Sequence, residues 1–179
     1  MDNFEYAFMK TLNLEGGYSN NPLDKGGKTN LGITKAVFED ALKRGIINGI
    51  SDIRFLTIAQ AKSIYKADYW LPIKLDMILD REIAAEIFDT AVNMGRNRAI
   101  KIAQESLNFL GEKIDVDGII GKITLTAIQK WINKDARALF VCLNGFQFIK
   151  YMDIIKNDSS QIRFSRGWTK RVQGYKEVI

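Results

Sequence analysis

The chain has 179 residues and no histidine, which excludes catalytic triads and metal sites that depend on an imidazole. Its one cysteine, Cys142, lies in an apolar run, so no disulfide forms within the chain and a buried core thiol is predicted. The net charge of +5 favours polyanionic partners. No loop is dense in calcium ligands, so we expect hydrolysis by carboxylates without a metal or other cofactor.

A short amphipathic helix is predicted before Glu15, because Phe4, Phe8 and Leu12 recur at helical spacing. The Gly16-Gly17 pair ends this helix. A carboxyl group in the last turn of a helix meets the negative end of the helix dipole, which raises its pKa when the group is also partly buried. A raised pKa suits a general acid. On spacing alone, a solvated acid at a helix C-terminus is the simpler interpretation of Glu15.

A small β-hairpin is predicted within residues 17–34, which are rich in glycine and asparagine and show no helical period. When this hairpin folds back, it places Asp24 and Thr29 opposite Glu15. Two carboxylates in unlike environments are what glycosidic hydrolysis needs, because one protonates the leaving oxygen and the other stabilises the positive sugar or activates water. The spacing is compatible with a carboxylate-based glycosidase, but by itself it does not favour one over the solvated acid.

Three helices are predicted next, over residues 35–47, 57–70 and 81–94, with Thr57 as a candidate N-cap of the second. The third carries a broad apolar stripe that is typical of a central buried helix. Its polar residues Asp89 and Asn93 have two interpretations, as the lining of a groove or as a hydrogen-bonded structural pair. These elements make up a predicted catalytic lobe of residues 1–94.

Further helices are predicted over residues 97–110, 124–131 and 137–155, and the Asp117-Gly118 turn tightens the first pair. They belong to a predicted helical lobe of residues 95–179 that packs with the first lobe as one compact unit. The tail of this lobe alternates basic and aromatic residues, namely Arg163, Arg166, Lys170, Arg171 and Lys176 with Phe164, Trp168 and Tyr175. We interpret it as a terminal helix with its aromatics inward and its charges outward. Stacking on nucleic-acid bases is the alternative, but no nucleic-acid motif accompanies it.

A set of residues at fixed offsets follows the first helix: Glu15-Gly16-Gly17-Tyr18, Asn21-Pro22, Asp24, Gly26-Gly27, Thr29 and Gly32-Ile33-Thr34. This set resembles the N-terminal signature of glycoside hydrolase family 108, the N-acetylmuramidases found as phage endolysins and as bacterial secretion activator proteins. The resemblance implies that Glu15 is the essential acid, that Asp24 stabilises charge and that Thr29 positions water. Lys25 and Lys28 stand where a proline and an acid are expected in the family.

A second set lies downstream, comprising Asn93-Met94-Gly95, Ala99, Ala103-Gln104, Leu107-Asn108, Val116-Asp117-Gly118-Ile119-Ile120-Gly121-Lys122 and Thr124-Leu125. It resembles the predicted peptidoglycan-binding region that accompanies family 108. Together the two resemblances imply an α+β, predominantly helical, lysozyme-like fold. They also imply a groove lined by Tyr18, Asp89 and Asn93, the last two on the central helix.

The implied activity is hydrolysis of the β-1,4 bond between N-acetylmuramic acid and N-acetylglucosamine in peptidoglycan. Lytic transglycosylase chemistry is the nearest alternative, because it also needs one glutamate but uses the muramoyl 6-hydroxyl in place of water. A non-catalytic wall-binding or secretion-accessory module is the third. Whether the reaction inverts or retains the anomeric configuration depends on the separation of Glu15 and Asp24.

Peptidoglycan is the expected partner, and the protein is expected to act as a monomer without nucleic acid. We expect no membrane insertion, because no apolar stretch is expected to approach the roughly 20 residues of a membrane span. The N-terminus has the acids Asp2 and Glu5 in place of a basic and apolar leader, which predicts that no Sec signal is present. We therefore expect release from the cytoplasm through a holin or a dedicated export system, and action in the periplasm or cell wall.

Overall fold

The computed structural model describes residues 1–13, 28–172 and 174 of the chain. Most of the described residues are helical, and a two-stranded antiparallel sheet is the only sheet among them. The elements in chain order are α1 (Asn3–Leu12), β1 (Thr29–Asn30), β2 (Ile33–Thr34), α2 (Lys35–Lys43), α3 (Ile58–Tyr65), α4 (Arg81–Met94), α5 (Arg96–Phe109), α6 (Lys122–Asn157) and α7 (Ser165–Thr169). The predicted α+β, predominantly helical fold with a small hairpin is therefore confirmed.

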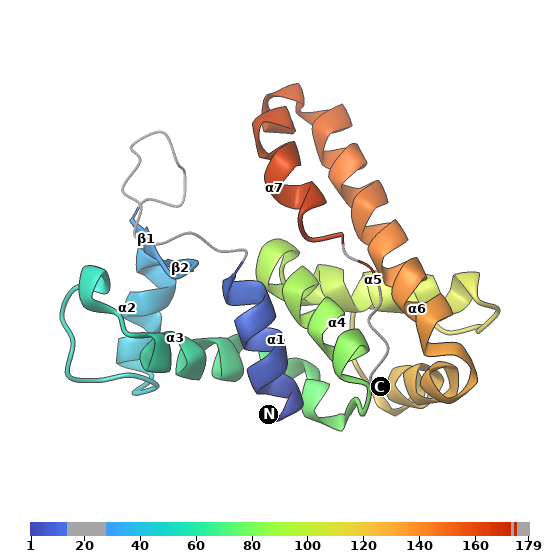
Figure 1. Cartoon of the computed structure of the whole chain (residues 1–179), viewed down its shortest axis with the longest axis horizontal. Coiled ribbons are helices and arrows are strands. Elements are labelled where there is room, and N and C mark those ends of the chain that lie inside the picture. The colour runs from blue at the N-terminus through green and yellow to red at the C-terminus, as the bar shows by residue number, and fades with distance from the viewer. Residues whose placement is uncertain (14–27, 173, 175–179) are drawn as a thin grey trace.

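Helix α4 is the centre of the fold, and α1, α5 and α6 pack around it (Figure 1). Ten of its 14 residues are buried, as its broad apolar stripe predicts. Aromatic rings fill the space between α4, α1 and the end of α3: Phe88 contacts the rings of Phe4, Tyr65 and Trp70 at centroid distances of 5.7–6.1 Å. The helix starts where Asp80 caps it by accepting hydrogen bonds from two backbone amides of its first turn.

The hairpin has only two residues in each strand, and hydrogen bonds to other elements hold it in place. Its turn is formed by Leu31 and Gly32, whose φ angles of 51° and 74° are those of a type I′ turn, which suits the twist of a hairpin. The side-chain amide of Asn30 donates hydrogen bonds to the backbone carbonyls of residues 53 and 54 at 2.9 and 3.2 Å. The hydroxyl of Tyr65 donates to the backbone carbonyl of Leu31 at 3.0 Å. The turn is thus fixed to the end of α3.

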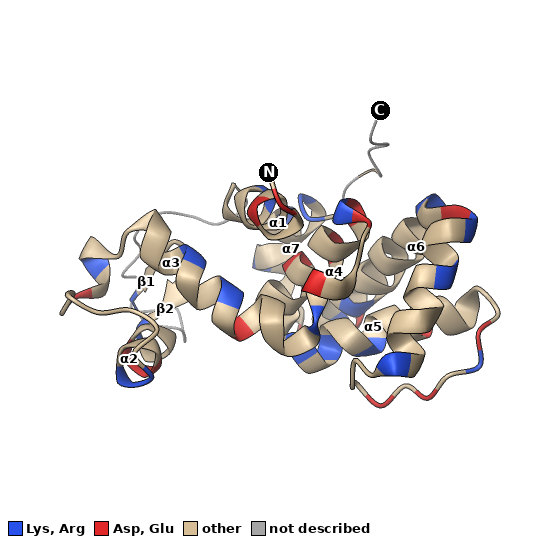
Figure 2. Cartoon of the chain, turned by 90° about the horizontal axis from the view of Figure 1, so that it is seen from below, with Lys and Arg blue, Asp and Glu red and all other residues tan. Residues whose placement is uncertain are grey.

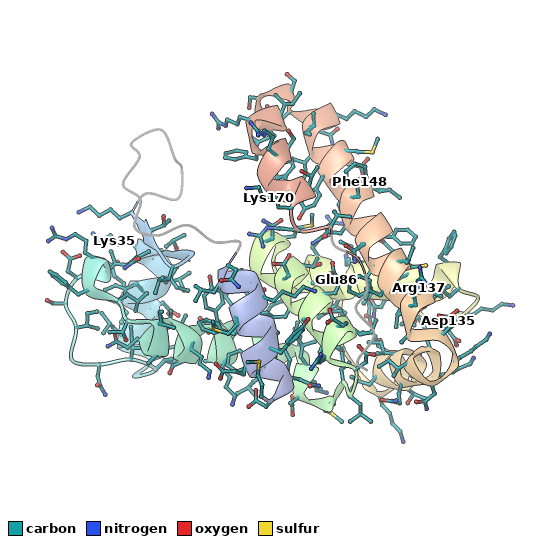
Figure 3. The ribbon with its side chains drawn as sticks, viewed as in Figure 1. Lys35, Glu86, Asp135, Arg137, Phe148 and Lys170 are labelled. Carbon is teal, nitrogen blue, oxygen red and sulfur yellow. The ribbon has the colours of Figure 1, made fainter. Side chains whose placement is uncertain are left out.

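Helix α6 consists of two helical segments that meet at Asp135, whose backbone is extended (φ −167°, ψ 83°). The carboxylate of Asp135 accepts a hydrogen bond from the amide of Ala138 at 2.9 Å and so caps the second segment. This bend separates the two helices predicted over 124–131 and 137–155. The second segment projects from the rest of the fold together with α7 (Figure 1), and Phe148 lies on its outer side, 42% exposed (Figure 3).

By length and composition alone, α6 is apolar enough to cross a membrane, although a third of its most apolar window is buried inside the protein. The expectation that no stretch has this length and composition is therefore wrong. The same run contains Cys142, which is half-buried, so the expected fully buried thiol is also wrong. The reason is that α6 turns one side to α4 and the other outward, with Val141 59% exposed beside the cysteine. Partial burial still raises the pKa of Cys142.

Two glutamates of α4 are buried in the core, and the apolar stripe did not predict them. Glu82 accepts hydrogen bonds from the hydroxyl of Tyr6 and from Nζ of Lys10, the latter at 3.1 Å. Glu86 lies one turn further along, in the packed centre (Figure 3). Burial, and secondarily the negative charge of Asp89, raise the pKa of Glu86 to about 8, whereas Lys10 acts in the opposite direction.

Glu86 should make the protein less stable as the pH rises. The folded state keeps Glu86 protonated up to about pH 8, while the unfolded chain ionises it near its ordinary value of 4.5. The stabilisation that this proton provides is therefore complete below about pH 4.5 and lost as the pH rises through about 8. Few other side chains titrate in this window, because the chain has no histidine. We expect Glu86→Gln to flatten this decline and to raise the free energy of unfolding at pH 8 by roughly 2 kcal/mol.

The measurement is urea denaturation of both proteins between pH 5 and pH 9. Glu39→Gln is the matched control, because Glu39 lies on α2 with its side chain 52% exposed. A wild-type stability that does not fall between pH 5 and pH 8, or an equal effect of both substitutions, would contradict the assignment.

Candidate functional site

The ends of α1 and α4 define the region in which the predicted site lies. The amide of Asn3 donates to the carbonyls of Ile78 and Leu79 at 3.1 and 3.2 Å, just before α4 begins. The two helices then run side by side in the same direction, so their C-terminal ends lie on the same edge of the molecule as the hairpin (Figure 1). Helix α1 confirms the helix predicted ahead of Glu15, but it ends at Leu12 with Asn13 as its C-cap, so the prediction that the Gly16-Gly17 pair ends it is wrong.

Three predicted site residues, Glu15, Tyr18 and Asp24, lie outside the described residues, and their roles stay predictions. Thr29 is described: it is half-buried in β1, opposite Thr34 of β2. The side chain of Thr34 accepts a hydrogen bond from the amide of Val37 at 3.4 Å and caps α2. The two threonines of this pair therefore differ in function, because only Thr34 has a capping role that explains its hydroxyl.

Asp89 is held in an ion pair with the C-terminal tail. Its Oδ1 accepts a hydrogen bond from Nη1 of Arg171 at 2.6 Å, and the two side chains are only 6% and 7% exposed. A buried carboxylate needs such a partner, because an unpaired charge in the interior costs several kcal/mol. The pair thus joins residues 82 positions apart in the chain. A contact of Asp89 with substrate stays a prediction.

The tail differs from the expected helix with aromatics inward and charges outward. Helix α7 is short, Arg171 points inward to Asp89, and Phe164 is 42% exposed. The physical reason is that the buried carboxylate of Asp89 on α4 requires a cation, which Arg171 of the tail supplies. This ion pair outweighs the hydrophobic free energy that burial of the Phe164 ring would provide. Trp168 follows the expectation, because its ring stacks on Tyr151 of α6 at a centroid distance of 4.9 Å.

Asn93 lies in the last turn of α4 and also bonds to α6. Its Oδ1 accepts a hydrogen bond from the hydroxyl of Tyr151 at 3.0 Å, and one turn earlier Thr90 accepts a hydrogen bond from Nε2 of Gln147, also at 3.0 Å. Burial of Tyr151, together with the charge of Asp89, raises the pKa of its hydroxyl, so this hydroxyl stays a donor. Both Asp89 and Asn93 are thus hydrogen-bonded, each to the C-terminal half of the chain.

Asn93 also lines a cavity of about 200 Å³ where α4 and α5 meet α6 and α7. The other described lining residues are Met94, Arg98, Lys150, Tyr151, Ile154 and Trp168. Asp89 is not among them. Among the described residues, no group of three or more acidic or cysteine side chains is arranged to hold a metal ion.

The Asp117-Gly118 turn is tied to α5 by one glutamine. Nε2 of Gln104 donates to Oδ1 of Asp117 at 2.7 Å, and its Oε1 accepts from the amide of Gly118 at 2.9 Å. The hydrogen bond from Gln104 is the main reason that the pKa of Asp117 is lowered. Gly118 has a φ of 77°, and a Cβ there would collide with the side chain of Asn97. These contacts account for the Asp-Gly sequence as a turn that fastens α5 to the start of α6.

Sequence reasoning missed Glu82 and Glu86 of α4, and it also missed the cations that pair with the acids of this helix. Figure 2 marks the acidic positions of α4 in red, between α1 and the C-terminal helices. Glu82, Glu86 and Asp89 follow one another at helical spacing inside an apolar stripe. Acids in such positions are buried and require donors, which is the signal that could have directed attention to Lys10 and to a cation of the tail.

Comparison with known proteins gives two family matches that together cover most of the chain. Residues 8–95 match the model described as glycosyl hydrolase 108, and residues 98–173 match the one described as predicted peptidoglycan domain. The solved structure of SagA from Brucella abortus is similar, with 30% sequence identity, a TM-score of 0.72, and coverage of 94% of this chain and 88% of that chain. No curated protein sequence is significantly similar.

We expect Arg171→Ala to destabilise the fold strongly, because it leaves the carboxylate of Asp89 buried without its cation. Removing one partner of a buried ion pair typically costs about 3–5 kcal/mol. Arg166→Ala is the matched control on the exposed side of α7 and should change the free energy of unfolding by less than about 0.5 kcal/mol. Chemical denaturation of both variants gives the two values.

A double-mutant cycle isolates the pair from other effects of the substitutions. Asp89→Ala combined with Arg171→Ala should cost less than the sum of the single changes, since neither charge is then left alone. Strict additivity, or an Arg171→Ala effect as small as that of Arg166→Ala, would show that the pair does not hold the tail.

Proposed function

The chain belongs to the glycosyl hydrolase 108 family, and on this premise we propose that it is an N-acetylmuramidase that cleaves peptidoglycan. The bond cleaved is the β-1,4 linkage between N-acetylmuramic acid and N-acetylglucosamine. One observation carries the proposal: the hydrolase match over residues 8–95 contains the Glu15 motif, and it adjoins a peptidoglycan-domain match over 98–173 in the same chain. These two matches support a protein that combines a catalytic acid with a means of binding the wall polymer.

In the proposed mechanism, Glu15 is the general acid. This is the role that the family resemblance gives to the glutamate of the Glu-Gly-Gly-Tyr sequence, and the segment that carries it follows α1 in the chain. A carboxyl group that stays protonated can transfer its proton to the glycosidic oxygen as the bond to the muramic acid breaks. The leaving N-acetylglucosamine then departs as an alcohol.

Asp24 and Thr29 are proposed to act on the other side of the sugar. Asp24 stabilises the positive charge that develops on the muramoyl ring, and the hydroxyl of Thr29 positions the water that attacks the anomeric carbon. Among the described residues, its strand partner Thr34 caps the helix that follows, so no capping role is assigned to the hydroxyl of Thr29. Tyr18 is proposed to line the groove.

Glu86 does not compete with Glu15 for the role of acid, although the pKa of Glu86 is raised. Its side chain is 1% exposed in the core between α1, α4 and α6, where a glycan chain has no access. We further propose that the protein acts in the cell wall or periplasm, after holin-mediated or dedicated export, because that is where its substrate lies.

Glu15→Gln should abolish lysis of purified sacculi while the protein stays folded. The amide has no acidic proton to give, and loss of a general acid typically lowers the rate by about 10²- to 10⁴-fold. Turbidity loss of sacculi measures lysis, and circular dichroism checks the fold. Glu105→Gln, on α5, is the control that should lyse normally. Normal lysis by Glu15→Gln would remove Glu15 from the mechanism.

Mass spectrometry of the products separates the reaction classes. Hydrolysis gives muropeptides with reducing muramic acid ends, whereas transglycosylation gives 1,6-anhydromuramic acid ends. Sacculi that bind the protein and stay intact would instead support a non-catalytic accessory role.

Asp24 and Thr29 are tested by substitutions that keep or remove one chemical group. Asp24→Asn should reduce turnover by about 10²-fold, because the charge that stabilises the sugar is lost. Thr29→Val should reduce turnover by about tenfold and Thr29→Ser should restore it, since serine keeps the hydroxyl. Full activity of both Asp24→Asn and Thr29→Val would mean that the stabilising group lies elsewhere.

A further inference from the structure

The cavity between α4, α5, α6 and α7 has the composition of a site for an anion. Two cations, Arg98 and Lys150, line it, and none of its described lining residues is acidic. Arg98 makes no hydrogen bond or ion pair with any described residue. Lys150 has Asp153 at 3.3 Å, but these side chains are 28% and 49% exposed, and such a pair is worth little. Both cations are therefore available to a ligand.

The rest of the lining adds an aromatic wall and a polar corner. Trp168 is stacked on Tyr151, with an angle of 9° between the rings, so the wall is rigid. Asn93 is fixed by the hydrogen bond from Tyr151, and the N–H groups of its side chain bond to no other described residue. A ligand with a carboxylate next to a small apolar group fits this combination, because a guanidinium binds carboxylates in a bidentate manner and a ring face accepts methyl groups.

The size of the cavity restricts the ligand further. Its volume of about 200 Å³ is below the roughly 300–1,000 Å³ of pockets that enclose a drug-sized molecule, so a short chain end fits and a disaccharide does not. In peptidoglycan, the parts that carry free carboxylates beside methyl groups are the peptide stems, whose ends are alanines. On the glycan strand, the lactyl group of muramic acid also has a methyl group beside a carboxyl group, but that carboxyl group is bound in the amide to the stem.

We propose that this cavity binds the carboxylate-bearing end of a peptidoglycan peptide stem, with Arg98 as the main contact of the carboxylate. The inference rests on the proposed function, because it takes peptidoglycan as the substrate. Asn93 and Met94 lie within the hydrolase match and the remaining lining residues within the peptidoglycan-domain match, so the cavity is built by both regions. A stem held there tethers its muramic acid near the C-terminal end of α4, on the edge of the molecule where α1 also ends.

The binding test uses a pentapeptide stem, L-Ala-γ-D-Glu-L-Lys-D-Ala-D-Ala, and the same peptide with a C-terminal amide. The readout is the indole N–H resonance of Trp168, which is one of three in the chain and is identified by its absence in Trp168→Phe. The free acid should shift this resonance saturably, and the amide should bind at least tenfold more weakly. Arg98→Gln should raise the Kd for the acid about tenfold, whereas Arg96→Gln, two residues away on the exposed side of α5, should leave it unchanged.

A rate comparison tests whether the site serves the reaction. Wild-type protein should cleave peptide-bearing glycan strands several-fold faster than strands from which an amidase has removed the peptides. Arg98→Gln should lose this preference, whereas Arg96→Gln should keep it. Three results would each overturn the proposal. They are equal binding of the acid and the amide, no effect of Arg98→Gln, and tighter binding of glycerol 3-phosphate than of the peptide.

The two proposals fail in different ways. Peptide binding that follows the expected pattern without cleavage of any glycan would refute the muramidase function and leave the stem site standing. Glycan cleavage without peptide binding would refute the stem site alone.

Discussion

The burial of charged groups along α4 is the constraint on which the arrangement of the chain depends. Three acids of this helix lie in the interior, and each must be neutralised or supplied with hydrogen-bond donors from another part of the chain. Lys10 of α1 donates a hydrogen bond to Glu82, and Arg171 of the tail donates one to Asp89. Burial keeps Glu86 protonated. The N-terminal helix and the C-terminal tail therefore both pack against the same central helix.

The same helix connects the two regions that the family matches distinguish. Through Phe88 it contacts the aromatic rings next to α1, and its last two turns present Thr90 and Asn93 to Gln147 and Tyr151 of α6. Polar contacts of this kind have strict geometry, so they fix the position of α6 along α4 more closely than apolar packing does. The peptidoglycan-domain region thus takes its position from a helix that belongs to the hydrolase match.

Local signals in the sequence were sufficient for most of the fold. Helix α4 was predicted with its observed bounds, because its apolar residues recur at helical spacing and Gly95 follows them. The Gly- and Asn-rich segment contains the predicted hairpin. The pairing of Asp89 with Arg171 could not be predicted, because 82 residues separate them and the tail offers several cations of equal merit. The exposure of Cys142 depends on which side of α6 faces α4, which periodicity in a long apolar run leaves open. The predicted site was only partly tested: the structure places Thr29, Asp89 and Asn93, whereas Glu15, Tyr18 and Asp24 lie outside the described residues.

The bend at Asp135 has a consequence for how the length of the chain can vary. An α-helix advances about 100° per residue, so one residue inserted between Asp135 and Gln147 would rotate both Gln147 and Tyr151 away from α4 together. The stacking of Tyr151 with Trp168, and with it the wall of the cavity, would be lost in the same step. Insertions and deletions in related chains should therefore be excluded from this stretch of α6 and concentrate at the bend or after Asn157, where an added residue changes no helical phase.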